Sequence, residues 1–143
     1  MFRLFWATFL FSVLFLFSTA SFAQEENDFH VVHVQTFKMH GVMGDDAEAF
    51  SETLKRQAGV INSDSRVLRS YVLRHYWGVD SRDLVLITEF ASDKDLFSFF
   101  TDMDSTFEKA FSKEQLDADN ALWTKYVGQH SDEIYRVVSD TRK

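Results

Sequence analysis

The sequence predicts a single α+β domain in which four β-strands alternate with three helices. Two kinds of segment alternate along the chain: stretches rich in β-branched and aromatic residues, and stretches whose apolar residues recur every three or four positions. The chain contains 5 glycines and no proline, so it offers no long linker that would separate two domains. Without an N-terminal leader, about 120 residues remain, which is enough for one hydrophobic core and too few for two.

The first 23 residues have the pattern of a secretory signal peptide. Arg3 supplies a basic start, Leu4 to Phe17 is almost entirely apolar, and Ser21 and Ala23 are small residues at −3 and −1 of a cleavage site. The alternative is an uncleaved membrane anchor, but the apolar run is short for a hydrocarbon core of roughly 30 Å. We therefore expect cleavage, export to the periplasm or the medium, and no membrane contact afterwards.

Composition limits what the remaining domain, residues 24–143, can be. The chain carries a net charge of −7 at pH 7 and shows no basic cluster, so a nucleic-acid partner is not expected. There is no cysteine, which excludes disulfides, thiolate zinc sites and a cysteine nucleophile. We therefore expect the domain to be held together by packing, with help from oligomerisation.

The first predicted strand spans Phe29 to Met39. Alternation places its residues on two faces: Val32, Val34 and Thr36 on one, and Val31, His33, Gln35 and Phe37 on the other. A helix follows, because Asp45 and Glu48 form a capping-box pattern before an apolar stripe. Gly59 is its expected end.

Strands two and three are predicted over Arg66 to Trp77 and Asp83 to Ala91, joined as an antiparallel hairpin. Ser92 begins the next helix, and Ser112 begins a further helix near Lys113 that Gly128 closes. The last strand is predicted over Asp132 to Ser139.

The resulting order, β-α-β-β-α-α-β, is the ferredoxin-like plan: a four-stranded antiparallel sheet with its helices on one face. Right-handed crossovers put the helices together on that face and leave the other face bare. A bare apolar sheet face is an association surface, so we expect a second copy of the chain to cover it.

The sequence resembles the dimeric α+β barrel superfamily in four features. These are the element order, the aromatic second strand ending in Trp77, the split helix before strand four and the run W-x-x-Y-x-G-x-H from Trp123. That group includes the antibiotic-biosynthesis-monooxygenase-like and stress-responsive barrel families. The resemblance spans Phe29 to Val138 and implies a homodimeric barrel, formed by two facing sheets, with a cavity. Haem-degrading members use an Asn, a Trp and a His together; Asn27, Asn62 and Asn120 do not fit that role, so haem has no motif to support it here.

Three groups of residues are candidates for chemistry. Glu89, in a strand expected near the centre of the sheet, is either a general base or the partner of Arg69 or Arg74 in a salt bridge. A second group could meet above the sheet as a ligand-binding surface for an aromatic molecule; it consists of His33, Tyr71, His75 and Trp77. No metal-ligand spacing is present among them, so no metal site is predicted.

His130 is the third candidate. The sequence predicts that it lies in a turn just after a helix, where the helix dipole, Asp132 and Glu133 would favour its protonated form. It is either a turn and capping residue or an acid–base residue at the mouth of a barrel.

Two functions remain open. The first is a ligand-binding, oxygenase-like barrel that takes a small apolar or aromatic molecule. The second is a non-catalytic dimer whose sheet face serves only association. A cavity on which the candidate side chains converge would favour the first.

Overall fold

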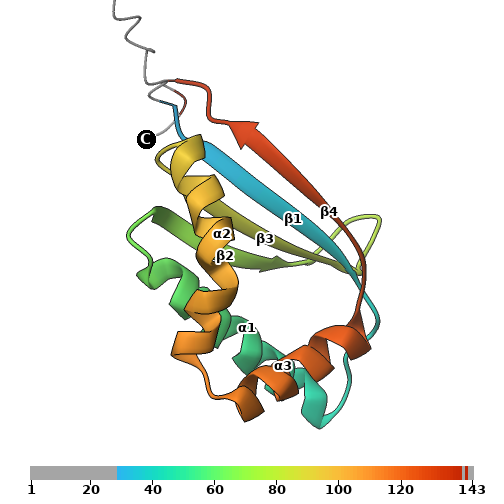
Figure 1. The fold of residues 1–143 in the computed structure, drawn as a ribbon. Helices are drawn as coiled ribbons and strands as arrows, with labels where there is room; N and C mark the ends of the chain where they lie inside the picture. Colours follow the sequence, from blue (N-terminus) through green and yellow to red (C-terminus); the bar gives the residue numbers. More distant parts are fainter. Residues whose placement is uncertain (1–28, 140, 142–143) are drawn as a thin grey trace, which may run out of the picture.

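The computed structural model describes residues 29–139 and 141, and these form four strands and three helices in the predicted order (Figure 1). The elements are β1 (Val31–Met39), α1 (Asp45–Ser63), β2 (Val67–Arg74), β3 (Asp83–Phe90), α2 (Asp93–Ala110), α3 (Lys113–Tyr126) and β4 (Val127–Arg136). The predicted signal peptide lies outside the described residues. Within the described part, no helix combines the length and the apolar character needed to span a bilayer.

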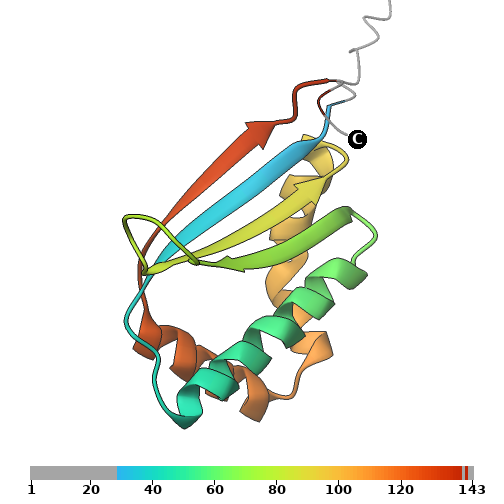
Figure 2. The ribbon, with the colours of Figure 1, turned by 180° about the vertical axis from the view of Figure 1, so that it is seen from behind.

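The four strands form one antiparallel sheet in the order β2-β3-β1-β4. All three helices lie on one face, which we call the inner face, and the outer face is bare, as Figures 1 and 2 show from opposite sides. The predicted ferredoxin-like plan is therefore confirmed. The register also confirms the alternation of β1, because Gln35 and Phe37 pair with Leu86 and Leu84, which pack on the inner face.

Two hydrophobic clusters fill the space between the inner face and the helices. One packs α2 onto the end of the sheet where β1 begins; its buried members are Val31, Val67, Phe90, Leu96 and Phe99. The other packs α1 and α3 onto the opposite end; its buried members are Phe50, Leu54 and Leu84. Between the two clusters lies the middle of the inner face, where polar residues and a pocket are found.

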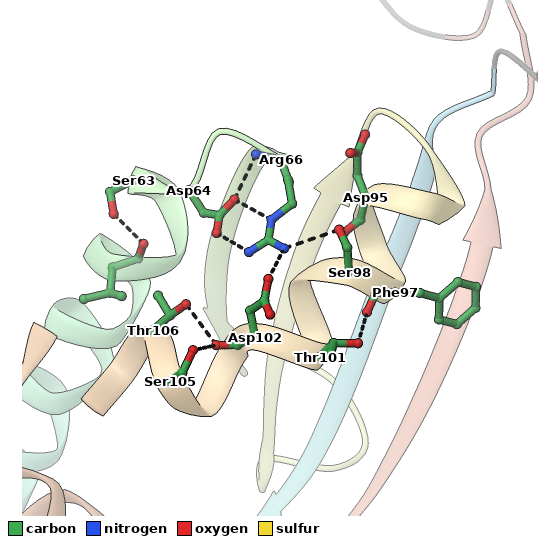
Figure 3. Close-up of polar contacts among 11 residues, drawn as sticks. Ser63, Asp64, Arg66, Asp95, Phe97, Ser98, Thr101, Asp102, Ser105 and Thr106 are labelled. Atoms are coloured by element: carbon green, nitrogen blue, oxygen red, sulfur yellow. Dashed lines mark hydrogen bonds and ion pairs between the residues drawn. The ribbon is translucent and has the colours of Figure 1, made fainter. Parts of the chain in front are cut away.

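Polar side chains fix the helices relative to one another. The Arg66 guanidinium binds both carboxylate oxygens of Asp64 (2.7 and 2.9 Å) and reaches across to Asp102 on α2 (2.9 Å) (Figure 3). Hydrogen bonding to Arg66 lowers the pKa of Asp64, so the clamp stays ionised at neutral pH. Thr53 on α1 donates a hydrogen bond to the buried carboxylate of Asp119 on α3 (2.8 Å), which joins these two helices.

The predicted caps of the two later helices are confirmed. Ser92 accepts a hydrogen bond from the Asp95 amide, and Ser112 accepts one from the Gln115 amide. The cap predicted for the first helix is wrong, because α1 begins at Asp45 directly after Gly44, and no side chain caps it. Gly44 has φ of 64° and ψ of −146°, a conformation that only glycine adopts readily.

The predicted end of the first helix is also wrong. α1 continues through Gly59 to Ser63, because Ile61 beyond it packs against the buried cluster around Phe90. Tertiary packing outweighs the cost of about 1 kcal/mol that a glycine imposes on a helix interior.

The last strand begins earlier than predicted. β4 starts at Val127 directly after α3, so Gly128 lies in the strand and does not end the helix. A side chain at Gly128 would approach the Lys38 carbonyl oxygen to 3.0 Å, so glycine permits the close approach of β4 to β1. The strand ends at Arg136, and His130 is therefore a strand residue paired with Phe37, not a turn residue.

Candidate functional site

A pocket of about 450 Å³ opens between the inner face and the three helices. Its apolar wall comes from both strands and helices and consists of Phe37, Ile61, Leu86, Met103, Phe107, Leu116 and Trp123. Its polar lining consists of Gln35, Gln57, Asp104, Glu108 and Asn120. This combination, mostly apolar with a few polar groups, is typical of a site for a small organic molecule.

Trp123 is fixed by contacts on three sides. Its indole nitrogen donates a hydrogen bond to Gln57 Oε1 (3.1 Å). Its ring meets Phe37 edge-on at a centroid distance of 5.2 Å and Phe50 at 5.5 Å. Since both polar and aromatic neighbours hold it, this wall of the pocket is preorganised.

A polar cluster borders the pocket where β1 pairs with β4, and Asp132 is its centre. His33 Nε2 lies 3.0 Å from Asp132 Oδ1, and Gln35 donates to the same oxygen at 2.8 Å. His130 Nε2 lies 3.1 Å from the other oxygen, Asp132 Oδ2. The His130 ring also stacks on Phe37, a residue of the pocket wall, at 5.2 Å. We call the four polar residues His33, Gln35, His130 and Asp132 the Asp132 cluster.

His33 is the buried member of this cluster, with 5% of its surface exposed. Burial lowers its pKa below the ordinary value of 6.5, and this effect exceeds the opposing influence of Asp132. His33 is therefore neutral at pH 7. Because a carboxylate only accepts hydrogen bonds, Nε2 carries the proton that Asp132 binds, and Nδ1 keeps its lone pair. An imidazole held in this way can accept a proton.

Sequence reasoning named His33 and His130 but missed the residue that joins them. The last strand is predicted to begin at Asp132, so the alternation does not assign this residue to a face of the sheet. The register of β1 with β4 pairs it with Gln35 and puts both on the inner face. A strand predicted to begin at Val127 would have placed Asp132 on one face with His130 and Ile134, because these residues alternate along it.

Glu89 does not belong to this site, because it lies on the outer face, in register with Val32 and Arg69. It is nevertheless buried, with 2% of its surface exposed. Arg69 Nε donates to it at 2.7 Å, and His30 Nδ1 lies 3.2 Å from its other oxygen. Of the two alternatives for Glu89, the salt bridge to Arg69 is the one observed.

The predicted meeting of His33, Tyr71, His75 and Trp77 above the sheet is wrong. Tyr71 is in register with Ile87 and Val34 on the outer face, opposite to His33. β2 ends at Arg74, so the alternation assumed for His75 and Trp77 stops before them. Trp77 is 91% exposed in the loop that follows. Among the described residues, no group of three or more His, Asp or Glu side chains could hold a metal ion.

No protein-family model matches the chain, and no curated protein matches it in sequence. Solved structures do match in fold. A putative antibiotic biosynthesis monooxygenase from Nitrosomonas europaea gives a TM-score of 0.53 at 15% identity, over 79% of this chain and 94% of that one. SnoaB, a cofactor-independent oxygenase from Streptomyces nogalater, gives 0.51 at 17% identity, over 78% and 95%. A dimeric protein of unknown function with a ferredoxin-like fold from Bacteroides fragilis gives 0.52 at 13% identity, over 76% and 96%.

At these identities the likeness concerns the fold. It confirms the ferredoxin-like architecture, which is the fold that the resemblance to the dimeric α+β barrel superfamily implies.

Proposed function

We propose that this protein is an exported homodimer that binds a small apolar or aromatic molecule in the pocket beside Trp123. The observation that carries the proposal is the pocket itself. Its volume of about 450 Å³ lies in the range of small-molecule sites. Its aromatic wall would stack on a flat ligand, and the Asp132 cluster at its border would bind a polar substituent.

The reaction that we propose for such a ligand is oxygenase-like. Neutral His33 would take a proton at Nδ1 from an acidic hydroxyl or carbon of the bound molecule and release its Nε2 proton to Asp132. Asp132 would pass that proton to His130, which is half exposed and can exchange it with solvent. Two proteins of similar fold are described as an oxygenase and a putative monooxygenase, and one of them as cofactor-independent. This likeness supports the class of reaction and not a particular substrate.

The homodimer is supported by the outer face. Tyr71, Leu73 and Tyr135 each expose between 41% and 54% of their surface there, on a sheet face that none of the three described helices covers. Apolar patches of this kind mark association surfaces. Two solved structures of similar fold are described as dimeric, which supports pairing of this face with a second copy.

Binding of 1-naphthol, a flat aromatic hydroxyl compound, tests the pocket by titration calorimetry. We expect saturable binding by the wild-type protein. Met103→Trp, which fills the pocket from α2, should abolish it. Phe97→Trp is the matched control, because Phe97 is on the same helix but 60% exposed and away from the pocket. Equal affinity in all three proteins would contradict the proposal.

Oxygen uptake separates the two candidate functions. If the protein is an oxygenase, naphthol-type compounds that bind should be consumed together with O₂, and His33→Gln should remove the consumption while binding persists. If the protein is only a dimeric interaction module, the outer face will associate but no ligand will be turned over. Haem is a useful second probe, since a Soret shift that His33→Ala abolishes would favour a carrier of that molecule.

A further inference from the structure

A second pocket, of about 330 Å³, lies at the end of the sheet where β1 and β2 finish and β3 begins. Its apolar floor is formed by Val42, Phe50 and Leu84. Its rim is formed by the segment after β1 and by the loop between β2 and β3. It shares no lining residue with the pocket beside Trp123.

Three side chains that can donate hydrogen bonds line this pocket and have no polar partner among the described residues: Arg74, His75 and His40. Arg74 is the last residue of β2 and lies in register with Leu84, so it belongs to the inner face. Arginine is permanently charged and binds planar anions through two parallel hydrogen bonds. An unpaired guanidinium beside two imidazoles and an apolar floor is therefore suited to binding an organic anion.

The other charges of the pocket are already neutralised. Asp83 and Asp80 are both bound by Lys38. Arg82 forms two hydrogen bonds to the Asp80 carboxylate, at 2.8 and 2.9 Å. Because Asp83 has its own cation, it does not compete for Arg74. The charge that remains unbalanced in the pocket is positive.

We propose that this pocket binds a small organic carboxylate whose apolar part rests on Phe50 and Leu84 and whose carboxylate is held by Arg74, with His75 and His40 as further donors. This inference does not depend on the function proposed above, since the two pockets are separate.

Benzoate is the probe, and the purified full-length protein is titrated with it while amide resonances are followed by NMR. We expect saturable shifts at His40, Gly41, His75 and Ser81, with a dissociation constant of about 1 mM or below, the range of a single strong contact supported by a small apolar area. Benzamide, which has nearly the same shape but no charge, should bind much more weakly. Inorganic phosphate should also bind more weakly than benzoate, because it lacks the apolar part.

Arg74→Gln should weaken benzoate binding at least about tenfold, since it removes a hydrogen-bonded charge. Lys94→Gln is the matched control: it makes the same change of net charge on the exposed side of α2, and it should leave binding unchanged. His75→Ala provides a second test should the first variant fail to fold.

Three results would overturn the inference. One is equal binding of benzamide and benzoate, and another is equal affinity in the Arg74 and Lys94 variants. The third is shifts confined to Leu116, Asn120 and Trp123, which would put benzoate in the other pocket. That last result would leave the function proposed for that pocket intact.

Discussion

The two faces of the sheet each bury an acid–histidine cluster, but the clusters are built in opposite ways. On the inner face His33 is buried and Asp132, its partner, is half exposed. On the outer face the carboxylate of Glu89 is buried and its partners His30 and Arg69 are the more exposed groups. The inner cluster has no full cation, whereas Arg69 supplies one on the outer face.

This difference separates the site that we propose for chemistry from a structural ion pair. The neutral imidazole of His33 has one ring nitrogen that can accept a proton, and Gln35 of the same cluster lines the pocket. The buried carboxylate of Glu89 is instead bound by the Arg69 guanidinium at 2.7 Å. The inner face is thus suited to chemistry, and the outer face to holding the sheet and a partner together.

The largest expected effect concerns the outer face. Leu73→Asp should convert the proposed dimer to a monomer, because it places a charge at the centre of the apolar patch. Phe97→Asp is the control, since Phe97 is a similarly exposed apolar residue on α2. Sedimentation at micromolar concentration measures the outcome. A wild-type protein that sediments as a monomer would refute the dimer.

The next effect concerns Glu89. Arg69→Met should lower the free energy of unfolding by about 2 kcal/mol, because it removes the cation that is bound to the buried carboxylate of Glu89. The loss is smaller than for a fully buried pair, since Arg69 is more than half exposed. Adding Glu89→Leu should restore most of the stability. Urea unfolding measures both, and no loss in the single variant would show that the pair is not structural.

A smaller effect concerns the response to acid. Because burial lowers the pKa of His33 in the folded protein, the unfolded chain binds the proton more readily. Stability should therefore be complete above about pH 6.5, the unfolded value, and should fall as the pH drops below it. His33→Gln should make the curve between pH 7 and 5 shallower, and His75→Gln should not. If stability depends on pH in the same way in all three proteins, His33 does not cause the loss of stability in acid.

The smallest expected effect concerns the influence of Asp132 on the pKa of His33. Asp132 raises the pKa of His33, although burial outweighs it. Asp132→Asn should therefore lower the pKa of His33 further, as measured by NMR of the imidazole protons. Asp104→Asn, at the rim of the pocket, is the control. An unchanged His33 pKa in the Asp132 variant would mean that the two residues do not interact.

Much of the fold could be predicted from the sequence because local signals agreed with the final structure. The alternation in β1 and the serine caps of α2 and α3 depend on neighbours in sequence, and all three were confirmed. The errors came where a distant contact outweighed a local signal. α1 continues beyond Gly59 because Ile61 packs on the core. Gly128 lies in β4 because the strand approaches the Lys38 backbone closely.

The site was only half predictable. His33 and His130 stood out by residue type, but their common partner Asp132 depends on how β4 pairs with β1, a register between segments almost a hundred residues apart. Tyr71, His75 and Trp77 failed as a group, because their facing depends on where β2 ends.

The amino-acid sequence by itself determined the order of the elements, the bare sheet face and the absence of thiol chemistry, since these follow from periodicity and composition. Only the tertiary structure decided which side chains meet. A shift of one residue in strand register turns every side chain to the other face, and the contacts that set the register lie far apart along the chain.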